Sequence, residues 1–189
     1  MIEIPAVVFA GGKSSRMGQD KALLPFEGTT LVSYQSSRLE SLFERVYVSA
    51  KKDIFKDNDL MVIQDDVLFD TYAPTAGFLT MFRRLKAENV FFVLSVDAPF
   101  VDKSVIDALM NAYDGKVDAV IARTASGIHP LCGIYTRALE APMLAMYAQN
   151  DHALGKLLSS MRVHFVDIDD ERKLYNMNTP QEYQEALKS

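Results

Sequence analysis

The sequence has few of the residues that cross-link small folds or gather metal ions. Its 189 residues include one cysteine, Cys132, and three histidines, so no intramolecular disulfide and no zinc-cluster spacing is possible. Tryptophan is absent, and nine glycines and seven prolines are too few for a collagen-like or low-complexity chain. The 49% hydrophobic and 24% charged residues are typical of an ordinary globular protein. A single cysteine fits a reducing compartment, and we expect a cytoplasmic location.

Long apolar runs and an excess of positive charge are also missing. The longest apolar run near the start, residues 4–10, is too short for the apolar region of a signal peptide or for a membrane span. Twenty-five acidic against 20 basic residues give a net charge of −5, which argues against nonspecific nucleic-acid binding through a broad basic face. A local cluster of cations is still compatible with a small anionic ligand. We therefore expect neither a membrane nor a nucleic acid among the partners.

Short apolar runs alternate with helical patterns along the chain. The strongest run, Val90–Val96, is typical of a strand buried on both faces of a parallel sheet, as is Ile4–Ala10. Further strands are expected at 46–48, 61–63, 118–122, 131–135 and 163–168, and helices at 31–42, 77–85, 105–113, 137–147, 153–161 and 181–187. The alternation predicts an α/β fold: a single domain over residues 1–189, with a mostly parallel sheet and helices on both faces.

The first expected strand ends in two glycines and runs into a loop rich in cations. Gly11–Gly12 allows backbone N–H groups to approach phosphate oxygens without a Cβ in the way. Lys13, Arg16 and Lys21 can offset the charge of a nucleoside triphosphate. The glycine spacing fits neither a P-loop, which needs glycine where Val7 stands, nor the dinucleotide fingerprint. On spacing alone, a glycine turn with a solvated basic loop is the alternative.

Residues 10–24, A-G-G-K-S-S-R-M-G-Q-D-K-A-L-L, resemble the signature loop of the nucleotidyltransferases with a Rossmann-like fold. Within them the loop is most similar to that of the molybdenum cofactor guanylyltransferases, because the related cytidylyltransferases more often show A-A-G. The resemblance implies transfer of GMP from GTP to the terminal phosphate of molybdopterin, with Mg²⁺ as cofactor and pyrophosphate as product. It also implies catalytic roles for Arg16 and Lys21. The nucleotide-binding residues implied in this region are Phe9, Ala10, Gly11, Gly12 and Lys21.

Asp97 follows the strand expected at 90–96. A carboxylate at the carboxyl end of a parallel strand lies where α/β sheets place their ligands. It also suits Mg²⁺, which takes one or two carboxylates together with substrate phosphates. The D-x-P element of the family, here Asp97-Ala98-Pro99, implies that Asp97 binds nucleotide and metal and is catalytic. The competing interpretation is a turn aspartate ahead of the helix expected from Val105.

The family carries an aspartate after the strand expected at 61–63 that contacts the guanosine part of GTP. By alignment of that strand the residue is Asp65, with Asp66 as the close alternative, and a solvated acidic loop is the structural interpretation. Two segments depart from the family pattern. The family often has an asparagine for the nucleotide where this chain has Ser49–Lys52, and its G-P-L-A-G segment reads A-P-T-A-G at Ala73–Gly77.

Three residues are expected on the side of the acceptor substrate: His129, Asn176 and Asn178. The segment from His129, H-P-L-C-G-I-Y, resembles the H-P-L-x-G-x-Y segment of the family, and residues 176–180 match its N-x-N-T-P. Two amides at i and i+2 point the same way in an extended segment and can donate to phosphate or to the outer shell of a metal. A local turn is the alternative for the asparagines. His152 has no motif around it, and Cys132 lies in a mostly apolar strand with no basic cluster nearby, so we expect both to be structural.

The sequence favours guanylyl transfer and keeps two other functions open. In the favoured interpretation the N-terminal half binds GTP and the C-terminal half binds molybdopterin, with contacts to other proteins of cofactor biosynthesis or to acceptor proteins. A molybdopterin cytidylyltransferase or a sugar-phosphate nucleotidyltransferase would share the loop and Asp97. A nucleotide sensor without turnover predicts a broken metal site, yet Lys21 and Asp97 are both present.

Overall fold

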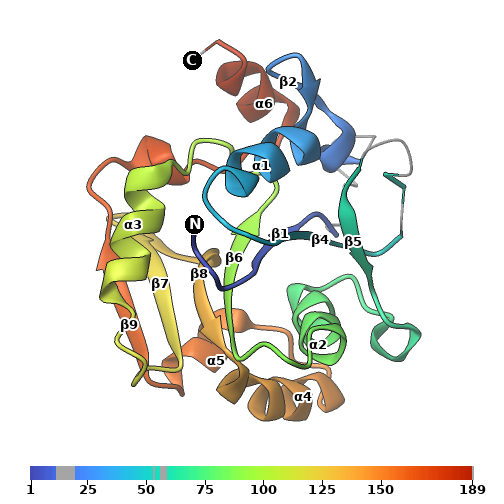
Figure 1. Ribbon diagram of the computed structural model, residues 1–189, viewed down its shortest axis with the longest axis vertical. Coiled ribbons are helices and arrows are strands. Elements are labelled where there is room, and N and C mark those ends of the chain that lie inside the picture. Colours follow the sequence, from blue (N-terminus) through green and yellow to red (C-terminus); the bar gives the residue numbers. More distant parts are fainter. Residues whose placement is uncertain (12–19, 53, 56–58, 189) are drawn as a thin grey trace.

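A seven-stranded sheet runs through the middle of the molecule (Figure 1). The computed structural model describes residues 1–189 except 12–19, 53, 56–58 and 189. The strand order is β5-β4-β1-β6-β8-β7-β9, and only the pairings of β8 are antiparallel. The strands are β1 (Ala6–Phe9), β4 (Val46–Ala50), β5 (Met61–Gln64), β6 (Val90–Ser95), β7 (Ala119–Thr124), β8 (Gly127–Thr136) and β9 (Val163–Asp167). The predicted α/β fold with a mostly parallel sheet is confirmed.

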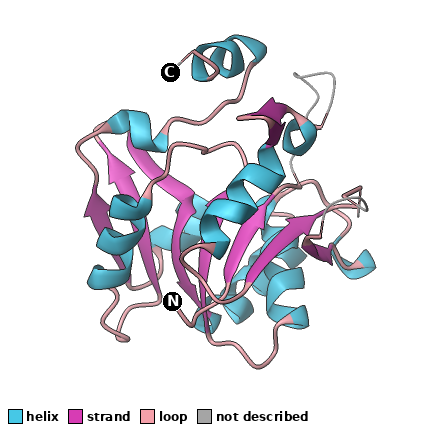
Figure 2. Cartoon of the chain, turned by 45° about the horizontal axis from the view of Figure 1, so that its top comes forward, coloured by secondary structure: helices cyan, strands magenta, loops and turns pink. Residues whose placement is uncertain are grey.

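Helices cover both faces of the sheet, as the buried strands require (Figures 1 and 2). One face carries α1 (Leu31–Glu40) and α3 (Lys103–Ala112), and the other carries α2 (Pro74–Arg84), α4 (Glu140–Ala148) and α5 (Leu154–Ser159). Successive strand residues enter opposite cores: Val8 packs with the α1 and α3 side, whereas Val7 packs with the α2 side. This alternation follows from the period of two along a strand, so both faces must be apolar.

Local signals in the sequence set the helix starts. Thr30 accepts a hydrogen bond from the Ser33 backbone N–H at the start of α1, and Asp102 accepts one from Val105 at the start of α3. Thr179 and Glu182 form a capping box at the start of α6 (Pro180–Ala186). Helix α6 lies against a short hairpin, β2 (Pro25–Phe26) and β3 (Thr29–Thr30), because the Tyr183 hydroxyl donates to the Pro25 carbonyl (Figure 1).

Three elements differ from the sequence expectations. Strand β8 starts at Gly127 instead of residue 131, because β7 and β8 form a hairpin whose register starts at Thr124 and Gly127. His129 is therefore a strand residue. The helix expected at 137–147 begins as a 3-10 turn, Arg137–Leu139, before α4. The hairpin at residues 25–30 was not predicted, since its strands are only two residues long.

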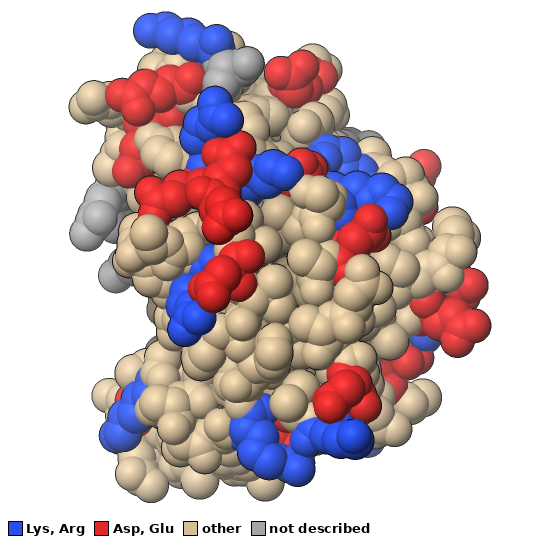
Figure 3. Space-filling view, turned by 90° about the vertical axis from the view of Figure 1, so that its left-hand side faces the viewer, with Lys and Arg blue, Asp and Glu red and all other residues tan. Residues whose placement is uncertain are grey.

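Charged side chains of both signs lie next to one another on the face shown in Figure 3. Ion pairs between described residues join Arg123 to Asp167 at 2.6 Å and Arg172 to Asp170 at 2.9 Å. That view shows no broad basic area, in keeping with the net charge of −5. In the part of the chain that the structure describes, no helix is long and apolar enough to cross a membrane.

Parallel pairing brings the carboxyl ends of four strands to one edge of the sheet. Phe9 is in register with Ser49 on one side and with Ser95 on the other, and Ser49 is in register with Ile63. Each of these strands is followed by a loop that carries residues singled out in the sequence. The fold therefore gathers these residues at the edge where parallel sheets bind ligands.

Candidate active site

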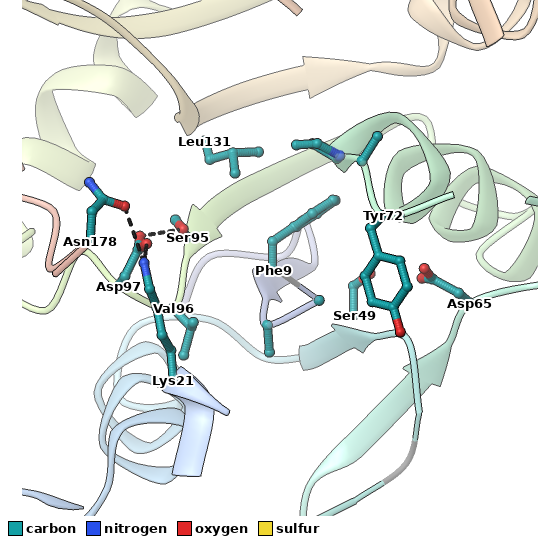
Figure 4. A pocket seen from close by; sticks show the side chains of 15 residues that line it. Phe9, Lys21, Ser49, Asp65, Tyr72, Ser95, Val96, Asp97, Leu131 and Asn178 are labelled. Atoms are coloured by element: carbon teal, nitrogen blue, oxygen red, sulfur yellow. Dashed lines mark hydrogen bonds and ion pairs between the residues drawn. The ribbon is translucent and has the colours of Figure 1, made fainter. Parts of the chain in front are cut away.

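Lys21, Asp97 and Asn178 meet at one end of this edge, although they come from distant parts of the chain (Figure 4). The Lys21 ammonium donates to Asp97 Oδ2 at 3.0 Å and to Asn178 Oδ1 at 3.1 Å. The Ser95 hydroxyl donates to the other carboxylate oxygen, Asp97 Oδ1, at 2.6 Å. The side chains of Lys21 and Asp97 are 19% and 14% exposed, so the ion pair is accessible from one side only. This cluster pairs a cation with an anion where a charged ligand can reach both.

The backbone around Asp97 is held from two directions. Gln35 of α1 is fully buried, and its amide donates to three carbonyls at the end of β6 and in the loop that follows, most closely to that of Ala98 at 2.9 Å. The Arg38 guanidinium donates to further carbonyls of the same loop. From the opposite side, the Met177 N–H donates to the Asp97 carbonyl at 2.9 Å. Sequence reasoning missed Gln35, whose signal is a polar residue on the apolar stripe of a helix.

Asp65 lies at the other end of the edge. Its backbone N–H donates to the Ala50 carbonyl at 2.9 Å, which places it directly after β5, and its side chain is 8% exposed. Burial raises the pKa of the Asp65 carboxyl, an effect that Lys51 opposes. Asp66 is directed elsewhere, since its carboxylate pairs with Arg83 at 2.8 Å and caps the following 3-10 turn. Of the two candidates, only Asp65 faces the space between the strand ends.

A pocket of about 250 Å³ joins the two ends (Figure 4). Phe9 lies between them, with Ser49 and Tyr72 toward Asp65 and with Val96 toward Lys21. The lining residues are Phe9, Ala10, Gly11, Lys21, Ser49, Asp65, Tyr72, Ala73, Pro74, Gly77, Ser95, Val96, Asp97, Leu131 and Asn178. The structure thus brings together the nucleotide-binding residues predicted from the sequence, except those outside the described part.

Helix α2 forms one wall of this pocket and depends on Gly77. A Cβ at this position would lie 2.7 Å from Phe9 Cε1 and 3.0 Å from Ser49 Oγ, so only glycine allows the helix to approach the strands this closely. Ala73, where the family segment has a glycine, needs no such close approach. Ala73 has φ −142° and ψ 149°, which is extended backbone that any residue adopts. Replacement of the first glycine of the family segment therefore introduces no backbone strain.

A second pocket, of about 430 Å³, lies on the far side of Asp97. It shares part of its wall with the first pocket, at Pro74, Ser95, Asp97, Leu131 and Asn178. All three residues expected on the side of the acceptor substrate line it: His129, Asn176 and Asn178. The two asparagines flank Met177, which is 1% exposed in the core, so both amides point to the pocket side as the i, i+2 spacing predicts.

The two histidines of this second pocket are both held by threonines. His129 Nε2 lies 3.1 Å from Thr124 Oγ1, and burial lowers the pKa of His129 while Glu171 opposes that effect. His152 Nδ1 lies 2.7 Å from the hydroxyl of Thr75, at the start of α2. His152 was expected to be structural only, and no sequence motif signalled that the fold would bring it to a pocket wall.

Cys132 is buried, as expected, and burial raises the pKa of its thiol to about 12. The thiol is therefore protonated and unreactive at neutral pH.

Gly12 and Arg16 lie outside the described residues, so the roles predicted for them stay predictions. Within the described ranges, no group of three or more His, Cys, Asp or Glu side chains could hold a metal ion. The single carboxylate of Asp97 fits Mg²⁺, which completes its coordination with phosphate oxygens and water.

A pocket at the carboxyl edge of a parallel sheet, with a lysine–aspartate pair beside a second pocket, is the arrangement expected of a nucleotide-dependent transferase. The chain belongs to the family of MobA-like NTP transferase domains, whose model matches residues 6–165. It is therefore a nucleotidyltransferase.

Curated relatives and solved structures agree with this assignment. The chain is 35% identical over 182 residues to the molybdenum cofactor guanylyltransferase of Campylobacter jejuni, covering 96% of this chain and 94% of the relative. It resembles the crystal structure of a putative protein from Aquifex aeolicus, with 29% identity, a TM-score of 0.79 and 94% of each chain covered. The molybdopterin-guanine dinucleotide biosynthesis protein A of Archaeoglobus fulgidus shares the fold, with a TM-score of 0.84, 18% identity, and 98% and 97% of the chains covered.

Proposed function

We propose that this nucleotidyltransferase transfers GMP from GTP to the terminal phosphate of molybdopterin, which forms molybdopterin guanine dinucleotide and releases pyrophosphate. The observation that carries the proposal is the position of the Lys21–Asp97–Asn178 cluster: Asp97 and Asn178 line both pockets, and Lys21, which donates to both of them, lines the first. Transfer between two substrates requires the reacting phosphates to meet at one point. The 35% identity to a curated guanylyltransferase over 96% of the chain supports the choice of both substrates.

The proposal assigns one pocket to each substrate. Residues before position 98 line most of the first pocket, which supports GTP binding by the N-terminal half of the chain. Residues after position 127 line most of the second, which supports binding of the acceptor substrate by the C-terminal half. Asn176, Asn178 and a neutral His129 would orient that substrate with hydrogen bonds, and Ile128, Leu131 and Leu174 supply apolar contact for a ring system. We place the reaction in the cytoplasm, as the one buried thiol supports.

Catalysis would combine positioning with electrostatic stabilisation. Asp97 would hold Mg²⁺, which neutralises phosphate charge when it is bound. The Lys21 ammonium, paired with Asp97 in the absence of ligands, would donate to the phosphates of GTP, and Arg16 would neutralise further charge. An oxygen of the acceptor phosphate forms the new bond to the α-phosphorus, and the bond to the leaving pyrophosphate breaks. A phosphate monoester is already anionic near neutral pH, so no general base is needed.

Calorimetric titration with GTP, CTP, ATP and UTP, each with Mg²⁺, tests the nucleotide half of the proposal. We expect GTP to bind with the highest affinity and binding to weaken when Mg²⁺ is removed. A turnover assay with molybdopterin and GTP, read as pyrophosphate release, then tests the acceptor substrate. Preference for CTP would overturn the guanylyl assignment while keeping the chemistry, and release of pyrophosphate with a sugar phosphate but not with molybdopterin would overturn the assigned acceptor.

A further inference from the structure

Lys51 occupies the segment in which the family often has an asparagine for the nucleotide. Its side chain is only 14% exposed, and its ammonium donates to the carbonyls of Phe69 and Thr71 at 3.2 Å each. The same ammonium lies 3.0 Å from Asp70 Oδ1 and 3.8 Å from Asp65 Oδ2. Lys51 is therefore engaged with one stretch of chain, residues 65–71, which forms the Asp65 end of the first pocket.

This stretch packs against the rest of the molecule through one apolar side chain, Phe69, whose ring lies edge-on to that of Tyr147 with the centroids 5.3 Å apart. Its regular structure is a single 3-10 turn, Val67–Phe69, in which Val67 and Leu68 are 91% and 59% exposed. Side chains from other elements hold the two ends of the stretch. At one end the Thr80 hydroxyl accepts a hydrogen bond from the Asp66 N–H, and at the other the Tyr147 hydroxyl is hydrogen-bonded to the Thr71 hydroxyl. Between these two points, the buried ammonium of Lys51 satisfies the carbonyls that turn inward. Without that ammonium, the Thr71 carbonyl would lose this donor and the Phe69 carbonyl would be left with the Thr71 N–H at 2.9 Å, so the stretch would relax toward solvent.

The stretch also presents the two groups that can recognise a base. The Asp65 carboxylate accepts hydrogen bonds only, and guanine alone among the common bases offers two adjacent donors, N1–H and the 2-amino group, for a bidentate contact. Tyr72 follows the stretch directly, and its ring lies 5.3 Å from the Lys51 ammonium, at the mouth of the pocket (Figure 4). An aromatic ring there can cover the face of the base.

We infer that Lys51 is the specificity-determining residue for guanine in this chain. It acts as a positioning residue: it fixes residues 65–71 so that Asp65 reaches N1–H and the 2-amino group while Tyr72 covers the ring. Where the family often has an asparagine that contacts the nucleotide, Lys51 thus supports the loop whose residues contact the base. Lys51 also favours the ionised carboxylate that this contact needs, because its charge opposes the effect of burial on the pKa of Asp65. The inference rests on the proposed use of GTP.

The test compares binding of GTP and ITP, which differ only in the 2-amino group, in the presence of Mg²⁺. The wild-type chain should bind GTP at least about tenfold more tightly than ITP, since one hydrogen bond to a charged group is lost. In Lys51→Met the GTP affinity should fall about tenfold, and the preference over ITP should shrink to less than about threefold. Lys51→Arg, which keeps the charge and donors, should restore most of the preference. Lys52→Met removes a neighbouring exposed lysine and is the matched control, for which we expect wild-type values.

The preference is the ratio of the GTP and ITP affinities measured on one preparation of each variant. A reduced folded fraction therefore does not change it. Should Lys51→Met fail to fold, Lys51→Gln keeps a donor for the carbonyls without the charge and should show an intermediate preference. A Lys51→Met or Lys51→Gln variant with the wild-type preference would overturn the inference. A wild-type chain that prefers CTP or ATP to GTP would instead overturn the proposed function.

Discussion

The two ends of the nucleotide pocket are built in different ways. At the Asp97 end, each functional residue is tied to regular structure: Asp97 follows β6, Asn178 precedes α6, and Lys21 begins a 3-10 turn capped by Asp20. At the Asp65 end, the wall is an irregular stretch supported from inside by Lys51. In the proposed function, the first end binds the phosphates, which every nucleoside triphosphate shares. The second end binds the base, which differs from one nucleotide to another.

This difference separates chemistry from selectivity. Groups that act on a transition state must be held to within a fraction of an ångström, and strand and helix ends supply that precision. A loop can change its supports without disturbing the sheet, so base recognition can change while the transfer step is kept. The departures from the family pattern, at Ser49–Lys52 and Ala73, both lie at the Asp65 end. Variants at the two ends should therefore fail in different ways.

The largest effect is expected at the Asp97 end. Asp97→Ala or Lys21→Ala should lower the rate of pyrophosphate release at least about a hundredfold. Lys21→Ala removes a positive charge aimed at the reacting phosphates, and Asp97→Ala removes the carboxylate that would hold Mg²⁺. The measurement is kcat at saturating GTP and molybdopterin. Asp107→Ala, which removes an exposed carboxylate on α3, is the control and should turn over normally. Full turnover by either site variant would refute the assignment of the site.

At the Asp65 end, affinity should change more than rate. Asp65→Ala should raise the Kd for GTP at least about tenfold, since a charged hydrogen-bond acceptor for guanine is lost. At saturating GTP, kcat should stay within about threefold of the wild-type value. Loss of an interaction that is equally strong in the bound substrate and in the transition state weakens binding without slowing the chemical step. Titration and steady-state kinetics of the same preparation measure both. A fall in kcat as large as that of Asp97→Ala would show that the two ends are not separable.

Asp65 also gives a pH signature in stability. Because burial raises its pKa, the folded state is favoured while the carboxyl is protonated, and that contribution is lost as pH rises through the raised value. Asp65→Asn, which stays neutral, should therefore melt at a higher temperature than the wild type at pH 7. The difference should shrink at acidic pH, where the wild-type carboxyl is also neutral. Thermal melts at several pH values would contradict this if the gap grew toward acid.

A smaller effect is expected where the second pocket meets α2. Thr75→Val removes the hydroxyl that holds His152 while keeping the shape of the side chain. The KM for molybdopterin should rise by about three- to tenfold, the equivalent of one hydrogen bond. The Kd for GTP should be unchanged, which separates this variant from those at Asp65. An unchanged KM in both Thr75→Val and His152→Ala would exclude a contribution of this contact to binding of the acceptor substrate.

The smallest effect concerns stability alone. Although burial opposes it, hydrogen bonds from Ser104, Lys173 and the Val105 N–H lower the pKa of Asp102 to about 2. A lowered carboxyl pKa stabilises the fold at neutral pH, and this contribution is lost as pH falls from about 4 toward about 2. Asp102→Ala should cost about 1 kcal/mol at pH 7, as loss of a helix cap does. The cost should vanish near pH 2, and kcat should not change, although Asp102 lies only one short loop away from Asp97.

The sequence was sufficient for the strands and for the motif residues. Buried parallel strands appear as continuous apolar runs, so the strands of the sheet could be placed to within a few residues. Lys21, Asp97 and the asparagines could be found because each lies in a short contiguous motif. Residues that act through distant partners could not. Gln35 stands out only as a polar residue on the apolar stripe of a helix, and Lys51 looks like an ordinary loop residue, until folding places carbonyls around them.

Long-range geometry also explains the remaining misses. The contact of His152 with Thr75 depends on how α2 packs beside the segment that joins α4 and α5, which no local pattern encodes. The choice between Asp65 and Asp66 depends on Arg83 and Thr80, which draw Asp66 away from the pocket. Short elements such as the hairpin at residues 25–30 are stabilised by α6 through Tyr183 and carry too few residues for a periodic signal.

The wall common to the two pockets has a consequence for inhibitor design. Since Pro74, Ser95, Asp97, Leu131 and Asn178 line both cavities, the two cavities adjoin one another along this wall. Two weakly binding fragments, one for each cavity, could be joined by a short tether that runs past Asp97. Each would then hold the other at an effective concentration on the order of millimolar, so the joined molecule would bind far more tightly than either fragment.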